Sequence, residues 1–407
     1  MSTRYVGLGE VASFVRGISF KPQDVGRVDS LGAVACMRTS NVQSELDLSD
    51  VWGVADSLVK RADQYLRHGD ILVSSANSWN LVGKCCWIPE LPWHATFGGF
   101  VSVLRADPAK VDPRFLFRWF ASTRIQATVR SFGQRTTSIS NLNLERCLDL
   151  PFPLLPLPAQ RRIAEVLDRA EALRVKRRFA LAQLNDLKLR FFDDLFEEFL
   201  GGPAVDSSPA RSGLPTGWSW QRLTSVARMA TGHTPDRERD DYWNGDIPWI
   251  SLTDIRELDG AVATRTSQSV TALGISHSSS VRLPPGTVCV SRTASVGFVT
   301  VMGPEMATSQ DFVNWVCGPT LEPLYLMWAF VSSRRRLRAL STGSTHKTIY
   351  MRVFEQLHVL VPPVTLQREF AQRIAVIDSI SADQRSALAQ LNTLFASLQA
   401  RAFQGEL

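Results

Sequence analysis

The sequence predicts an α+β protein built by internal duplication, in which two globular domains are separated by two long helices that form an antiparallel coiled coil. Three observations predict this fold. Two segments of the chain repeat each other, each repeat carries apolar residues at seven-residue spacing, and the region before each repeat alternates short β-rich runs with turns.

The duplication is visible as a constant shift along the chain. The segment Leu181 to Asn185 (Leu-Ala-Gln-Leu-Asn) recurs as Leu388 to Asn392, which gives a shift of 207 residues (388 minus 181). The same shift superimposes Gln160 on Gln367. We therefore expect both segments to have the same structure and to occupy equivalent places in the fold.

Each repeat is predicted to be a long helix with a coiled-coil seam. One seam position is assigned to Ile163, Ala170, Leu184 and Phe191, and in the second repeat to Phe370, Ile377, Leu391 and Leu398. The other seam position is assigned to Val166, Leu173, Ala180 and Leu187, and to Ile380, Ala387 and Leu394. Arg177 and Gln384 interrupt the seam at equivalent places.

Neither helix interior contains Gly or Pro. A helix from Ala159 to Leu200 has a length of about 60 Å at the usual rise per residue. Because so narrow an apolar stripe cannot be buried alone, each helix needs a partner, and the other repeat is the simplest one. The pairing should be antiparallel, since a whole domain separates the two helices.

The regions before the helices repeat more weakly. The matched segments are Leu8–Gly17 with Leu223–Gly232, Gly69–Ser74 with Gly286–Ser291, Phe100-Val101 with Phe312-Val313, and Gly133 and Ile139 with Gly343 and Ile349. Each region also contains a helical stretch, at residues 113–130 and 323–340. We divide the chain into domains at 1–150 and 218–358, spacer helices at 151–200 and 359–407, and a Gly-, Pro- and Ser-rich linker at 201–217.

Composition limits the class of protein. The formal charge of +6 and the pI of about 9.1 are compatible with an acidic partner such as nucleic acid. The chain starts without an apolar leader and contains no apolar run long enough for a membrane span, which predicts a cytoplasmic protein with no membrane partner. The six cysteines lack zinc-site spacing, and Cys85 and Cys86 are interpreted as buried, reduced thiols in a strand.

Two basic windows lie at equivalent places in the two halves. No Asp or Glu occurs between Asp112 and Glu145, or between Glu322 and Glu355. The candidate phosphate-binding residues in these windows are Arg124, Arg130, Arg334, Arg335 and Arg336. A window of one charge sign suits a phosphate backbone, although acids from elsewhere in the fold could also neutralise it.

Each window ends in a small polar loop whose side chains can hydrogen-bond base edges or phosphates. The candidate DNA-binding residues in these loops are Gln134, Arg135, Thr136 and Thr137, and Ser344, Thr345, His346 and Lys347. Arg135 and Lys347 are taken to occupy equivalent loops. A second pair of matched polar turns contributes Asn77 and Arg292.

No catalytic, cofactor or metal site is predicted. The sequence contains no phosphate-binding Gly-x-x-x-x-Gly-Lys-Ser/Thr loop, no Asn/Asp-Pro-Pro-Phe/Tyr tetrapeptide and no convincing nuclease pattern. The six histidines are scattered and form no His-x-x-x-His pair. A serine–histidine–aspartate triad is not excluded by sequence.

Several motifs resemble the specificity subunits of type I restriction–modification systems. The motifs are Leu214-Pro215-x-Gly217-Trp218, Gly232-His233-Thr234-Pro235, Tyr242 to Trp249, Thr253-Asp254-Ile255, and the Pro-rich step into Gln160-Arg161-Arg162-Ile163. The second copy departs from the pattern with Phe370 where Ile is usual, and the opening of the first domain, Gly17 to Pro22, is a looser match. The resemblance covers essentially the whole chain.

The resemblance implies two target-recognition domains that each read one half of a split, asymmetric site in double-stranded DNA. The paired helices would fix the gap between the half-sites. Two methyltransferase subunits would dock on the helices, and ATP-dependent motor–nuclease subunits would join them, while this subunit would not be catalytic and would need no cofactor. The residues expected to carry partner docking are Gln160, Ile163, Leu184, Gln367, Phe370 and Leu391.

Two other readings of the sequence remain open. One is a stand-alone nuclease with an active site that no motif reveals, which a Mg²⁺-dependent cleavage assay would detect. The other is an interaction scaffold that uses its coiled coil and binds no DNA, which a salt-dependent gel shift would test.

Overall fold

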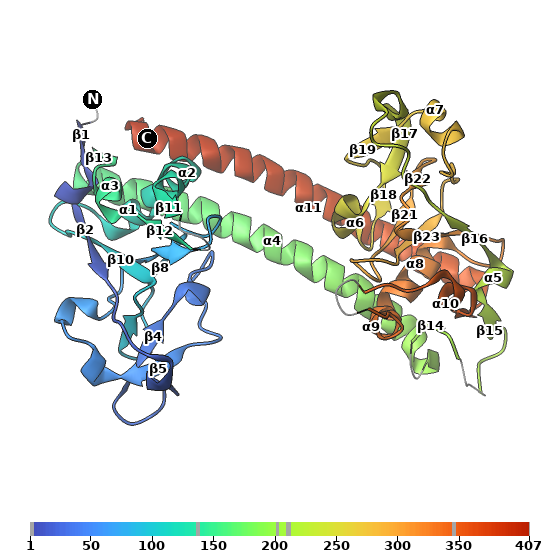
Figure 1. Ribbon diagram of the computed structural model, residues 1–407, viewed down its shortest axis with the longest axis horizontal. Helices are drawn as coiled ribbons and strands as arrows, with labels where there is room; N and C mark the ends of the chain where they lie inside the picture. Colours follow the sequence, from blue (N-terminus) through green and yellow to red (C-terminus); the bar gives the residue numbers. More distant parts are fainter. Residues whose placement is uncertain (1–3, 136–138, 201–202, 209–212, 344–346, 407) are drawn as a thin grey trace. The chain divides into compact units, whose positions relative to one another are not determined.

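The computed structural model describes residues 4–135, 139–200, 203–208, 213–343 and 347–406, and it confirms a mixed α and β fold with two long helices. The chain divides into two compact units, Met1–Arg178 with Ala387–Leu407, and Phe179–Ser386. Each unit therefore combines one globular domain with part of α4 (Leu157–Leu200) and part of α11 (Val364–Gln404) (Figure 1).

The predicted limits of the spacer helices need correction at their starts. Residues 151–154 form strand β13 (Pro151–Leu154), and residues 358–361 form strand β24 (His358–Val361). Each helix begins directly after a proline, Pro156 or Pro363, because proline has no N–H to donate and is compatible with a strand edge or a helix start. Within the predicted linker, Val205–Asp206 forms strand β14, which pairs with β24.

The described residues of the first unit form four small sheets. Their strand orders are β2-β10-β6-β8, β3-β5-β4-β9, β11-β12-β7 and β1-β13. The strands are β1 Arg4–Gly7, β2 Ala12–Arg16, β3 Val25–Gly26, β4 Ala33–Met37, β5 Trp52–Ala55, β6 Ile71–Ser74, β7 Ala76–Asn77, β8 Cys85–Trp87, β9 Ala95–Phe97, β10 Val101–Ala106, β11 Gly133–Arg135 and β12 Ser140–Leu142. The helices are α1 Pro113–Phe120, α2 Thr123–Ser131 and α3 Leu144–Leu148.

The second unit is built on a similar plan, and the strands described in it include a five-stranded sheet. The strand orders are β16-β23-β20-β21-β18, β19-β17-β22 and β14-β24-β15. The strands are β15 Ser219–Arg222, β16 Ala227–Thr231, β17 Trp243–Ile250, β18 Val262–Ala263, β19 Gln268–Val270, β20 Val288–Ser291, β21 Val299–Met302, β22 Ala307–Thr308 and β23 Phe312–Cys317. The helices are α5 Leu223–Val226, α6 Leu252–Leu258, α7 Ala272–Ser276, α8 Pro323–Ser332, α9 Arg334–Ala339 and α10 Met351–Glu355.

Strand register corrects one of the sequence matches between the halves. Ser74 pairs with Val101 in the first unit, and its counterpart Ser291 pairs with Phe312 in the second. Val101 is therefore equivalent to Phe312, one residue away from the predicted match. Because a one-residue slip moves a side chain to the other face of a sheet, Phe100 is 64% exposed while Phe312 is fully buried.

Within each unit the segments of α4 and α11 run antiparallel. In the first unit Arg174 Nε donates to Asn392 Oδ1 at 2.7 Å, and in the second Phe192 packs edge-on against Phe370 with ring centroids 5.4 Å apart. Residues late in one helix thus face residues early in the other in both units.

The structure overturns the second of the two predicted seam positions. Leu173 and Leu187 are 52% and 48% exposed, whereas their neighbours Arg174 and Lys188 face the other helix. The third and the fourth residue after Ile163 lie on adjacent faces of the helix. The residue that faces the other helix is the fourth, whereas the sequence prediction had chosen the third. The real second position is held by Leu167, Arg174, Leu181 and Lys188, and in α11 by Ile374, Ser381, Leu388 and Phe395.

One buried glutamine at the start of each long helix attaches that helix to its own domain. Gln160 donates to the Leu155 carbonyl at 2.7 Å and accepts from the Asp112 N–H at 2.8 Å. Gln367 makes the equivalent bonds to the Pro362 carbonyl at 2.7 Å and from the Glu322 N–H at 2.8 Å. Satisfying these backbone groups fixes where each helix leaves its domain.

The cysteine interpretation is borne out for Cys86, which is buried and free in β8, while Cys85 beside it is half-buried and also free. Burial raises the pKa of the Cys86 thiol to about 12, so it is protonated at neutral pH. Among the residues that the structure describes, no helix is long and apolar enough to cross a membrane.

Candidate nucleic-acid interface

The described residues on both sides of the first unit's polar loop lie in one small sheet with the polar turn. Strand β12 pairs with β11 on one side and with β7 on the other. Gln134 is opposite Asn141, and Ser140 is opposite Asn77. The fold therefore brings together two segments that lie more than fifty residues apart in the chain.

The second unit has the same arrangement in reduced form. Thr348 forms isolated bridges with both Thr342 and Thr293, so the loop again meets the turn. The Ala294 N–H donates to the Lys347 carbonyl at 3.2 Å, and Ala294 has a φ of 51°. This left-handed conformation is unfavourable for a residue with a side chain, and such strain tends to persist at functional sites.

These hydrogen bonds correct the loop alignment taken from the sequence. The Leu142 N–H donates to Ser75 and the Ile349 N–H donates to Arg292, at 2.8 and 2.9 Å, so Leu142 is the counterpart of Ile349. Both are buried, whereas Ile139 is 42% exposed. The first loop is thus longer than the second. The sequence match selected the exposed Ile139 in place of the buried Leu142, which is the true counterpart of Ile349.

The same correction separates Arg135 from Lys347. Lys347 directly precedes Thr348, as Ser140 precedes Asn141, and Arg135 lies on the facing strand opposite Ser140. Arg135 and Lys347 therefore belong to opposite strands of corresponding hairpins. Thr136, Thr137, Ser344, Thr345 and His346 lie outside the described residues.

Acids from elsewhere in the fold reach several arginines of the basic windows. Arg334 pairs with Asp259 at 2.6 Å, and Arg336 pairs with Asp206 at 3.1 Å. In the first unit Asp168 of α4 pairs with Arg118 at 2.5 Å. Acids distant in the sequence therefore neutralise these arginines, which is the alternative that the sequence left open.

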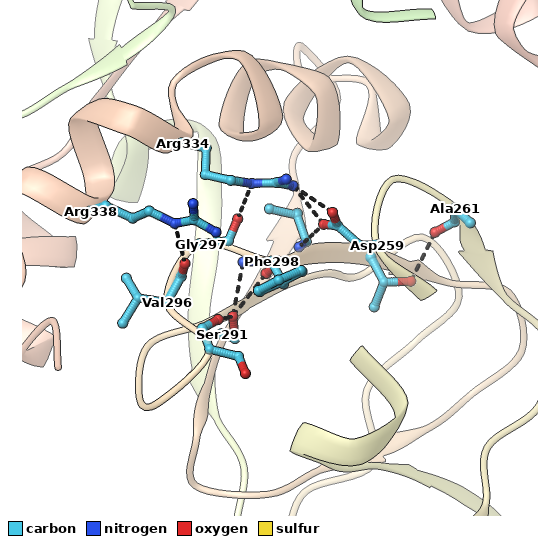
Figure 2. Close-up of polar contacts among 11 residues, drawn as sticks. Asp259, Ala261, Ser291, Val296, Gly297, Phe298, Arg334 and Arg338 are labelled. Atoms are coloured by element: carbon cyan, nitrogen blue, oxygen red, sulfur yellow. Dashed lines mark hydrogen bonds and ion pairs between the residues drawn. The ribbon is translucent and has the colours of Figure 1, made fainter. Parts of the chain in front are cut away.

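Figure 2 shows how two arginines of α9 bind the backbone of Val296 and Gly297, next to the polar turn. Arg334 Nε donates to the Gly297 carbonyl at 2.8 Å, and Arg338 Nε donates to the Val296 carbonyl at 3.1 Å. Ser291, at the start of the turn, accepts from the Phe298 N–H at 3.0 Å. Arg334 and Arg338 therefore position the turn, a role for Arg338 that sequence reasoning missed because the windows were judged by charge alone.

Other predicted residues are exposed and make no ion pair among the described side chains. They are Arg124, Arg130, Arg335 and Lys347. Gln134 is also exposed, while the Asn77 amide donates to Ser74 Oγ at 3.0 Å and Arg292 donates to the Gln310 carbonyl at 3.0 Å. The exposed cations keep their charge available to a phosphate backbone.

Neighbouring arginines should separate support of the fold from contact with DNA. Arg334→Ala leaves Asp259 without its cation and should lower the free energy of unfolding by about 1–3 kcal/mol in a denaturant titration. Arg335→Ala should leave stability unchanged but weaken DNA binding and flatten its salt dependence by up to ~0.9 for each phosphate that is no longer neutralised. Equal DNA affinity and salt slope for Arg335→Ala and the unaltered chain would contradict this assignment.

Comparison with known proteins agrees with these features. Residues 215–392 match the family model described as the type I restriction modification DNA specificity domain. The EcoKI specificity subunit of Escherichia coli (strain K12) is 24% identical over 98% of this chain and 87% of its own length. Over nearly its whole length the chain is similar to type I restriction–modification specificity subunits. These relatives are named as the specificity subunits of their restriction enzymes.

Two further proteins are similar to this chain over different lengths. The MjaIX specificity subunit of Methanocaldococcus jannaschii is 24% identical over 41% of this chain and 39% of its own length. A solved chain, from work on complex assembly and conformational transition of the type I restriction–modification system, shares the fold with a TM-score of 0.56. It is 18% identical and the match covers 100% of this chain and 98% of that one.

The predicted docking residues are mostly unavailable to a partner. Gln160, Ile163, Gln367 and Phe370 are buried within their own units, with exposures of 1% or less. Leu184 and Leu391 are half-buried at the seam. A surface for a partner on these helices would therefore consist mainly of other side chains.

Proposed function

We propose that the chain recognises a bipartite, asymmetric site in double-stranded DNA and directs partner subunits to it. The observation that carries the proposal is the duplication of the hairpin-and-turn arrangement, once in each unit, beside exposed cations. Direct reading of base edges requires polar side chains on elements that can enter a groove. Two such arrangements in one chain favour two separate half-sites.

Differences between the two hairpins support asymmetry of the site. The first presents Gln134 on a longer loop, and the second presents Lys347 on a shorter one. Amide and ammonium groups favour different base edges, because an amide both donates and accepts hydrogen bonds while an ammonium only donates. The two half-sites should therefore differ in sequence.

The long helices are proposed to set the distance between the half-sites. Helix α4 continues without a break from one unit into the other over 44 residues, which corresponds to about 66 Å. A continuous helix pair is stiff in comparison with a flexible linker. A stiff spacer would fix the number of unspecified base pairs between the half-sites.

The exposed apolar residues of the helices are proposed to dock two methyltransferase subunits, which motor–nuclease subunits then join for cleavage. Leu173 and Ile380 are equivalent under the 207-residue shift and are 52% and 44% exposed. Leu187 and Leu394 form a second equivalent pair, 48% and 52% exposed. A surface that occurs twice fits two copies of the same partner.

Selection of bound duplexes from a randomised DNA library tests the proposal. We expect the chain, assembled with its methyltransferase partners, to enrich two short, different sequences separated by unspecified bases of one length. Enrichment of one continuous sequence, or of the same half-sites at many spacings, would contradict it.

A further inference from the structure

Two cations form ion pairs in the buried seam between α4 and α11, and both belong to α4. The side chain of Lys188 is only 2% exposed, and its ammonium pairs with Asp378 of α11. The side chain of Arg174 is 18% exposed and pairs with Glu171, three residues earlier on the same helix. The Arg174 guanidinium also lies over the ring of Phe395, 4.4 Å from its centroid.

The duplication shows that these two sites correspond but are built differently. Under the 207-residue shift, the counterparts of Lys188, Asp378 and Ser381 are Phe395, Glu171 and Arg174. At each of these two levels of the seam there is thus one acid, one cation and one neutral residue. In the second unit the acid comes from α11, while in the first unit both charges come from α4.

This distribution makes only the unlike helix pair neutral. In a pair formed by two α4 helices from different copies of the chain, each level would hold Glu171, Arg174 and a second cation, Lys188. In a pair formed by two α11 helices, each level would hold Asp378 with Ser381 and Phe395 and no cation. A buried charge without a partner is strongly destabilising.

The same residues also fix the register of the pairing. A slip by one heptad would place Lys188 opposite Ala371 or Arg385 in place of Asp378. The first alternative leaves both charges unpaired, and the second brings two cations together. Single polar residues in a coiled-coil seam are known to select partner and register at a cost in stability.

We propose that Lys188, Asp378, Arg174 and Glu171 select the α4–α11 pairing against pairing of like helices from a second copy of the chain. Selection of this kind keeps two different recognition domains in every assembled unit, where pairing of like helices would join two identical ones. The inference concerns helix pairing alone and does not depend on whether the chain binds DNA.

The test removes the charges together, so that no buried ion is left alone. In the Lys188→Met, Asp378→Asn double variant, the unlike pair and both like pairs are all neutral at these two levels of the seam. Ala180→Cys supplies the readout, because the observed register would place residue 180 of one α4 beside residues 179 and 180 of another. Neither long helix contains a native cysteine.

Full-length chains are refolded from denaturant at rising protein concentration, oxidised and separated without reductant. We expect the Ala180→Cys chain to give little disulfide-linked dimer and the neutral double variant in that background to give several-fold more, increasing with concentration. The charge-reversed variant Lys188→Glu, Asp378→Lys restores an unlike pair and should return the dimer to the low level.

Circular dichroism establishes that each variant is folded before the comparison is made. A folded neutral variant with no more linked dimer than the unaltered seam would overturn the proposal, since the charges would then select nothing. Equal dimer from the charge-reversed and neutral variants would overturn it as well, because complementarity of charge would have no effect.

Discussion

Glutamate at Leu173 and Ile380 is expected to abolish binding of the methyltransferase subunits while leaving the chain folded. Both side chains are about half exposed, so charge is tolerated in the free protein. A partner that covers them would have to bury the carboxylates, and it would also forgo about 1.5–3 kcal/mol of apolar burial at each site. Together these costs should lower the affinity for each partner copy more than a hundredfold.

Co-purification and analytical size exclusion measure this effect. The matched control is Gln183→Glu with Gln390→Glu, an exposed polar pair that is also equivalent under the duplication. The control adds the same charge to the same two helices and should still bind two partner copies. If both variants bind partner equally well, the exposed residues do not form the docking surface.

The exposure of Leu173 and Leu187 shows what the heptad pattern could and could not predict. Seven-residue spacing identified two long helices and one seam position correctly, because apolar residues there recur in both copies. The second position was misassigned since the true one contains Arg174 and Lys188, which look like surface residues in a sequence. Glu171 neutralises Arg174 from the same helix, whereas the partner of Lys188, Asp378, lies on the other helix and is visible only once the helices are paired.

The candidate site was predictable in composition more than in alignment. The polar loops and turns were found from the sequence, and the fold brings them together in both units. Residue matches across weakly repeated regions failed by one residue at Phe100 and by three at Ile139, where similar letters occupy opposite environments. Hydrogen-bond register distinguishes these positions, and a single sequence does not contain it.

Charge windows were the least reliable sequence signal. A stretch without acids says nothing about acids that tertiary structure supplies, and Asp259 and Asp168 approach the windows from distant segments. Arg334 was therefore predicted as a DNA contact although it forms an ion pair and holds a loop. Arg335, its neighbour in sequence, keeps an exposed side chain and remains the better candidate.

Lengthening both helices by one heptad is expected to lengthen the gap in the recognised DNA without changing either half-site. Duplicating residues 178–184 in α4 and 385–391 in α11 preserves the seven-residue repeat and adds equivalent segments to both helices. The insertion adds about 10 Å at 1.5 Å per residue, which corresponds to about three base pairs at 3.4 Å each. Three base pairs also rotate one half-site by about 100° around the DNA, so binding should weaken as the complex takes up this rotation.

Library selection with the lengthened chain measures the preferred gap directly. Four added residues would break the seven-residue repeat and shift the seam, so the heptad duplication is the cleaner change. The Gln183→Glu, Gln390→Glu chain, whose helices keep their length, should retain the original gap. A lengthened chain that selects the original gap, or accepts many gaps equally, would show that the helices do not set the spacing. Their exposed leucines could then still dock partners, because docking requires only the local surface, whereas spacing requires a stiff connection along the whole length of α4.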